Sequence, residues 1–161
     1  MKNGFLAALA LLISMTAAFA ALPARAASVA IVSAAVSPAT ALAGGKGVLT
    51  VTFTIASGYH VNANKPGDPY LIGTEFVPAA AIGVTFGKAV YPPVKTLKVS
   101  ASPKPLLVYA GKNTVKVPFT LAKTVKPGPL ALGGSFNYQA CNATSCNPPA
   151  SAKVSASVIV K

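Results

Sequence analysis

Alternation of apolar and polar residues dominates the chain from residue 28 onward. Over residues 48–55, every second position is apolar and three threonines lie between these positions. A period of two is typical of a strand with one buried face. The same pattern recurs over residues 114–121 and 153–160. The sequence therefore predicts three long amphipathic strands, with Pro118 on the polar face of the second indicating an edge or a bulge.

Shorter strands are predicted between these three. The candidates are residues 28–36, 59–62, 84–91, 106–109 and 130–138, and turns rich in glycine and proline separate them. Gly133 and Gly134 in the last candidate allow a close backbone approach or a bulge. No segment after residue 28 predicts a helix of any length. Many short strands spaced by such turns predict an all-β fold, an immunoglobulin-like antiparallel β-sandwich.

The N-terminal segment has the features of a secretory signal. Lys2 precedes an uncharged stretch with an apolar centre that extends to Ala24. Alanine-flanked sites predict cleavage after Ala20 or Ala26. We therefore expect residues 1–26 to be a signal peptide and residues 27–161 to form one domain. An uncleaved membrane anchor is the alternative, but the alanines and Pro23 disfavour it, and no transmembrane segment is expected in the mature chain.

The charge of the chain is strongly positive. Removal of Lys2 and Arg25 with the signal lowers the formal net charge from +12 to +10, carried by lysines against only Asp68 and Glu75. The mature part has no arginine, no tryptophan and no run of lysines, so we expect no nucleic-acid partner. Dispersed lysines favour a soluble surface with some attraction to anionic membranes or acidic proteins.

Few residues are available for other chemistries. Paired-carboxylate hydrolysis would require Asp68 and Glu75 to converge in one cleft. A metal site has only His60, Cys141 and Cys146 as strong ligands, one fewer than a closed site needs, so neither a metal nor another cofactor is expected. A cysteine with His60 but without an orienting third group does not indicate a hydrolase.

Cys141 and Cys146 remain as the candidate functional pair. In an oxidising compartment, two cysteines this close in sequence are expected to form a disulfide with each other. A bridge across about six residues contributes only about 2 kcal/mol through chain entropy, against nearly 5 kcal/mol for about a hundred residues. The predicted strand 130–138 leads into Cys141, and Asn147, Pro148 and Pro149 follow Cys146. The predicted turn is accessible to a partner thiolate, but spacing alone leaves a reactive and a structural bridge both open.

Residues 136–149, with the pattern Tyr-Gln-x-Cys-x4-Cys-x-Pro-Pro, resemble the active-site hairpin of the N-terminal periplasmic domain of the thiol:disulfide interchange protein DsbD. The segment 58–72 resembles the part of that family that follows an early strand. With residues 91–93 and 108–109, the resemblance covers nearly all of residues 29–161. The resemblance implies the same immunoglobulin-like fold and an exported, periplasmic protein.

The resemblance also implies a function and roles for individual residues. Members of the family relay electrons from a membrane-embedded reductant, through a thioredoxin-like domain, to oxidised periplasmic proteins. Cys146 is then expected to form mixed disulfides with partners and Cys141 to resolve them. Tyr138, Gln139 and Pro149 belong to the hairpin motif as supporting residues. His60 and Asn62 are expected to line the thiols, where some members have tyrosines; a half-buried strand end is the alternative.

The sequence departs from the family pattern in three respects. No membrane segments or C-terminal thioredoxin-like domain follow the domain, so a thioredoxin-like or membrane-embedded thiol reductase is expected to act in trans. The loop 100–105, expected to cover the disulfide, has no aromatic residue. The loop between the cysteines has four residues, whereas some relatives have five. The competing hypothesis is a binding or scaffold domain with a structural disulfide.

Overall fold

The computed structural model describes residues 29–99 and 104–161, which contain twelve strands and no helix. The signal predicted for residues 1–26 lies outside the described residues, and so does most of the loop 100–105. No described helix is long and apolar enough to cross a membrane. The prediction of an all-β chain is confirmed.

The strands form three sheets of four strands each. In the first sheet the order is β1 (Ala30–Ser37), β3 (Lys46–Ile55), β9 (Lys112–Leu121) and β6 (Val84–Phe86). In the second it is β2 (Thr40–Ala41), β12 (Ala150–Val160), β10 (Gly128–Tyr138) and β5 (Glu75–Pro78). In the third it is β11 (Ala140–Cys141), β4 (His60–Asn62), β8 (Leu106–Tyr109) and β7 (Lys95–Leu97). Among the strands of the described residues, only β2 and β12 pair in parallel.

The core lies between the first two sheets. The inward positions of β3 and β9 are almost fully buried, as their alternation predicts. Phe53 of β3 meets Phe136 of β10 with ring centroids 4.6 Å apart, and Tyr109 of β8 contacts Phe53 edge-on at 5.8 Å. These aromatic contacts join all three sheets, and the first two sheets form the expected sandwich.

Gly133 and Gly134 lie where β10 passes between β12 and β5. A Cβ on Gly133 would clash with the carbonyl of Val154, and one on Gly134 would clash with the carbonyl of Val77. The predicted close approach of backbones is therefore present on both sides of β10. This close approach allows β10 to pair with β12 on one side and β5 on the other, and to continue to Tyr138, just before the cysteine hairpin.

The structure corrects one sequence prediction and decides between the two alternatives of another. The candidate strand 84–91 ends at Phe86, and its remainder contributes only an isolated bridge between Val90 and Lys116. Of the two alternatives for Pro118, the edge is excluded, since β9 lies between β3 and β6. The bulge is confirmed: between the pairs Phe86–Phe119 and Val90–Lys116, residues 87–89 lie opposite only residues 117–118. Pro118 has no N–H to donate to the ladder with β6. That ladder is interrupted beside it, after the end of β6, and the backbone N–H of Gly87 donates to the Pro118 carbonyl there at 2.8 Å. The proline is tolerated because the neighbouring segment leaves the ladder there.

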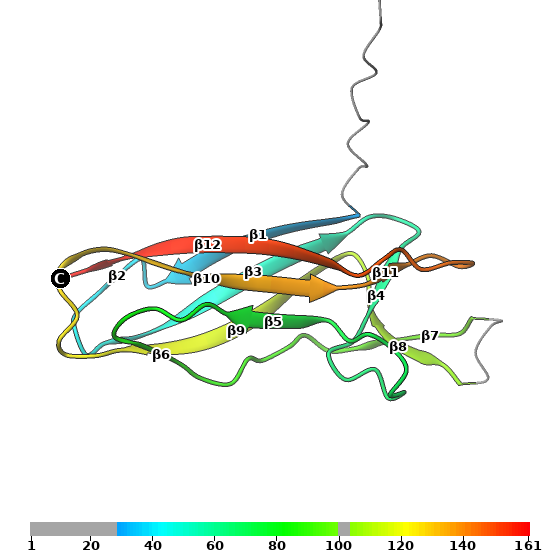
Figure 1. The fold of residues 1–161 in the computed structure, drawn as a ribbon, viewed down its shortest axis with the longest axis horizontal. Helices are drawn as coiled ribbons and strands as arrows, with labels where there is room; N and C mark the ends of the chain where they lie inside the picture. Colours follow the sequence, from blue (N-terminus) through cyan, green and yellow to red (C-terminus); the bar gives the residue numbers. More distant parts are fainter. Residues whose placement is uncertain (1–28, 100–103) are drawn as a thin grey trace, which may run out of the picture.

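The third sheet lies at the end of the sandwich opposite the C-terminus (Figure 1). Val61, Tyr109 and Ala140 join the hydrophobic core on one side of this sheet. His60 and Cys141 pair across β4 and β11, and Asn62 pairs with Val108 across β4 and β8. Side chains alternate along strands, so His60, Asn62 and Cys141 project from the other face. Because one face of the third sheet packs against the hydrophobic core, the positions of His60, Asn62 and Cys141 on its other face are fixed.

Candidate functional site

Cys141 and Cys146 form a disulfide across a tight hairpin, with Cα atoms 3.9 Å apart. Backbone hydrogen bonds flank the pair on both sides. The backbone N–H of Asn142 donates to the Ser145 carbonyl at 2.9 Å, and the backbone N–H of Asn147 donates to the Ala140 carbonyl at 2.8 Å. The cysteines thus occupy a non-hydrogen-bonded position of an antiparallel ladder, where opposite side chains come closest.

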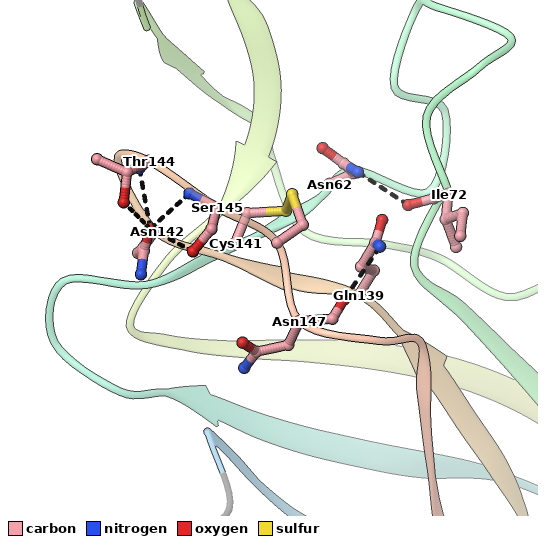
Figure 2. Close-up of a disulfide and its surroundings, with 9 residues drawn as sticks. Asn62, Ile72, Gln139, Cys141, Asn142, Thr144, Ser145 and Asn147 are labelled. Carbon is pink, nitrogen blue, oxygen red and sulfur yellow. Dashed lines mark hydrogen bonds between the residues drawn. A yellow bond between two sulfur atoms is a disulfide. The ribbon is translucent and has the colours of Figure 1, made fainter. Parts of the chain in front are cut away.

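The side chain of Asn142 organises the turn between the cysteines. Its Oδ1 accepts hydrogen bonds from the backbone N–H groups of Thr144 and Ser145, at 2.9 and 2.8 Å (Figure 2). The hydroxyls of the same two residues also donate to it, at 3.1 and 3.3 Å. This Asx-type turn needs no glycine, and the four-residue loop is held by local bonds.

The two cysteines differ sharply in exposure. Cys141 is only 5% exposed because β11 pairs with β4, whereas Cys146 lies in the exposed arm of the hairpin. Gln139 joins the two arms by donating from Nε2 to the Asn147 carbonyl at 3.1 Å. A partner approaching from solvent therefore meets Cys146 before Cys141.

A pocket of about 450 Å³ opens beside the disulfide and is lined by both cysteines, His60 and Asn62. His60 is 6% exposed and Asn62 is 2% exposed. Asn62 donates from Nδ2 to the Ile72 carbonyl at 3.0 Å, which fastens the segment after β4 beside the disulfide (Figure 2). The structure thus brings together the two residues that the sequence placed near the thiols.

Tyr138 and Pro149 flank the site without lining this pocket. Tyr138 is 8% exposed and packs against Phe136 with ring centroids 5.7 Å apart. Pro149 is exposed and immediately precedes β12, which resumes pairing at Ala150 opposite Tyr138. Tyr138 therefore packs at the base of the first arm of the hairpin, and Pro149 lies where the second arm leads into β12.

The sequence matches the family model described as thiol:disulfide interchange protein DsbD, N-terminal, over residues 27–157. The chain belongs to this family. The resemblance seen in the hairpin motif thus extends over most of the sequence, and the domain is a thiol:disulfide interchange domain. No curated protein shows significant sequence similarity to the chain.

Solved structures similar to this DsbD N-terminal family member include the following two domains. The N-terminal periplasmic domain of ScsB from Proteus mirabilis is 13% identical with a TM-score of 0.49, and the match covers 78% of this chain and 44% of that one. The chain thus spans less than half the length of that protein's structure. The reduced DsbD N-terminal domain from Neisseria meningitidis is 22% identical with a TM-score of 0.44, covering 69% of this chain and 77% of that one.

Sequence reasoning missed several residues that line the disulfide pocket. Asp68 and Leu71 reach the pocket from the segment after β4, and Val99 and Leu106 reach it from the ends of the loop before β8. Asp68, Leu71 and Val99 lie outside the predicted strands, and Asp68 was considered only as a possible partner of Glu75. Glu75 instead pairs with Asn137 across β5 and β10, so the two acids belong to different parts of the fold.

No group of three or more His, Cys, Asp or Glu side chains suited to a metal occurs within residues 29–99 and 104–161. His60 faces the disulfide, with Asp68 on the same pocket and Lys95 and Lys98 on the adjoining surface. Besides the cysteines, the titratable groups that the described residues contribute to these two hollows are thus one imidazole, one carboxylate, the phenol of Tyr59 and two ammonium groups.

Burial lowers the pKa of His60 below its ordinary value of 6.5. The folded state therefore binds fewer protons than the unfolded state as the pH falls through about 6.5, and stability decreases with decreasing pH until His60 is protonated in both states. We expect urea unfolding between about pH 8 and 5.5, above the usual carboxylate range, to show this slope. His60→Gln should flatten it, and an unchanged slope in that variant would contradict the prediction.

Proposed function

We propose that this domain is a periplasmic dithiol carrier that relays electrons from a reductant acting in trans to oxidised exported proteins. The observation that carries the proposal is the asymmetry of the disulfide, with Cys146 exposed and Cys141 buried at the mouth of a pocket. Family membership supports thiol–disulfide exchange at this pair. The donor is expected to be a thioredoxin-like protein or a membrane-embedded thiol reductase.

Reduction of the domain begins with attack by a partner thiolate on Sγ of Cys146. The Cys141–Cys146 bond breaks, Cys141 leaves as a thiolate, and a mixed disulfide joins Cys146 to the partner. The partner's second thiolate then attacks the partner sulfur that is bonded to Cys146, and an intramolecular disulfide forms in the partner. Cys146 is released as a thiolate, and the partner leaves oxidised after giving two electrons to the domain.

Transfer to the acceptor runs in the reverse direction. The Cys146 thiolate attacks one sulfur of the acceptor disulfide and forms a mixed disulfide, while the other acceptor sulfur leaves as a thiolate. Cys141 then attacks Sγ of Cys146, which restores the Cys141–Cys146 bond and releases the acceptor as a dithiol. The hairpin holds both cysteines in facing positions, so the resolving attack needs little rearrangement.

The surroundings of Cys141 support its role as the resolving cysteine. A thiolate in a buried site is costly unless it is stabilised or protonated. His60 lies opposite Cys141 in the β4–β11 ladder, and its lowered pKa keeps the imidazole neutral near pH 7. A neutral imidazole accepts a proton from the Cys141 thiol or donates its N–H to the thiolate. His60 is thus proposed as a positioning residue for the thiolate of Cys141.

The proposal is tested by redox equilibration. The oxidised domain is incubated with a reduced thioredoxin-like protein, free thiols are trapped by alkylation, and the products are weighed by mass spectrometry. We expect two alkylated cysteines and a potential in the range of exchange proteins. No reduction, or a potential below about −300 mV, would indicate a structural disulfide and contradict the carrier function.

A further inference from the structure

A second hollow adjoins the disulfide pocket on the outer face of the third sheet. It has a volume of about 460 Å³ and runs from the first residue of β4 across β8 to β7 and the residues that follow β7. His60, Val99 and Ala143 line both this hollow and the disulfide pocket. The two are therefore parts of one continuous surface, and we call the second part the lysine groove.

The lysine groove has a distinct charge. Lys95 and Lys98 line it, both exposed, and no carboxylate does so among the described residues. Lys95 donates from Nζ to the Ala110 carbonyl at 3.4 Å, which holds its ammonium group over the groove. Asp68 lines only the disulfide pocket, and its Oδ1 accepts a hydrogen bond from the Tyr70 N–H at 2.9 Å. The groove therefore presents positive charge beside the reacting disulfide.

The sheet register fixes how far this charge lies from the disulfide. Cys141 on β11 and Lys95 on β7 are separated by three strand spacings of about 4.8 Å each. Lys95 pairs with Val108, and Val108 pairs with Asn62. Asn62 lies two residues along β4 from His60, which pairs with Cys141. The offset brings this separation to about 16 Å. Cys146 pairs with Cys141 on the side away from β4, with its Cα 3.9 Å from that of Cys141, so the reacting cysteine is about 20 Å from Lys95. An extended chain advances about 3.4 Å per residue and covers this distance in five or six residues.

We propose that the lysine groove docks an extended acidic segment of the redox partner, with Asp or Glu five or six residues from the partner's reacting cysteine. The inference rests on the proposed function, because the partner's cysteine must be at Cys146 for the spacing to apply. Charge complementarity of this kind raises the rate of encounter and selects among partners. Partners without such an acid are expected to react, but more slowly.

Synthetic peptides of about thirteen residues test the proposal. Each carries one central cysteine as a mixed disulfide with 2-mercaptoethanol, which is uncharged. One peptide has Glu at the fifth and sixth positions on both sides of the cysteine, a second has Gln at those positions, and a third has Glu only next to the cysteine. The reduced domain is mixed with each peptide, and the rate of its oxidation is followed by acid quenching and mass spectrometry.

We expect the first peptide to react about three- to tenfold faster than the second at low salt, which corresponds to one or two exposed ion pairs. The advantage should largely disappear at about 0.5 M salt. The double variant Lys95→Gln/Lys98→Gln should lose it as well. The matched control Lys123→Gln/Lys126→Gln, which removes the same charge from the turn before β10, should retain it.

Each other outcome overturns a different claim. Equal rates for all three peptides would refute docking in the lysine groove while leaving thiol exchange intact. An advantage for the third peptide, or loss of the advantage in the control variant, would show a general charge effect and also refute the groove. Reaction with none of the peptides would refute the proposed function, and the docking proposal with it.

Discussion

Cys141→Ser is expected to capture a partner as a stable mixed disulfide, whereas Cys146→Ser is expected to capture almost none. In Cys141→Ser the remaining thiol lies in the exposed arm of the hairpin, and no second thiol is present to release the partner. In Cys146→Ser the remaining thiol belongs to the residue that is 5% exposed, and we expect its exchange and alkylation to be at least about tenfold slower. Neither variant completes a cycle of electron transfer.

The two variants serve as controls for each other. Both lose the same bridge, and the chain-entropy cost of about 2 kcal/mol is therefore the same in both. The measurement is incubation with an oxidised thioredoxin-like protein, followed by non-reducing electrophoresis and mass spectrometry of the adduct. Capture by Cys146→Ser but not by Cys141→Ser would reverse the assigned roles. Equal capture by both would show that burial does not select the attacking cysteine.

Phe136→Ala should cause the largest loss of stability. Phe136 is fully buried and contacts Phe53 of the opposite sheet and Tyr138 of its own strand. Truncation of a buried phenylalanine costs about 3–5 kcal/mol, a large part of the 5–15 kcal/mol by which domains are ordinarily stable. We expect the midpoint of urea unfolding of the oxidised protein to fall accordingly.

Ile31→Ala is the matched control for this prediction. Ile31 lies on β1 and is 71% exposed, so its truncation is expected to change the unfolding free energy by less than about 0.5 kcal/mol. A loss below about 1 kcal/mol in Phe136→Ala would contradict the central role of this aromatic contact. Because β10 leads directly into the cysteine hairpin, we also expect faster alkylation of the reduced Cys141 in Phe136→Ala.

The sequence by itself determined the strands whose two faces differ in polarity. β3, β9, β10 and β12 each contain a predicted segment, since burial of one face imposes a period of two on the residues. It also determined the cysteine pair, because two cysteines five positions apart after a strand have few alternatives to pairing with each other. The hairpin motif in the sequence was sufficient to indicate the family that the family model matches.

Only the tertiary structure decided what surrounds the cysteine pair. β5, β7 and β11 have two to four residues each, too few for a period to emerge, and their pairing depends on neighbours distant in sequence. The burial of Cys141 against His60, and the approach of Asp68 and Leu71, arise from the packing of the third sheet and of an irregular segment. A local pattern records which face of a strand is buried, whereas the neighbours across a sheet depend on the course of the whole chain. The asymmetry between the two cysteines and the position of the lysine groove therefore came from the fold.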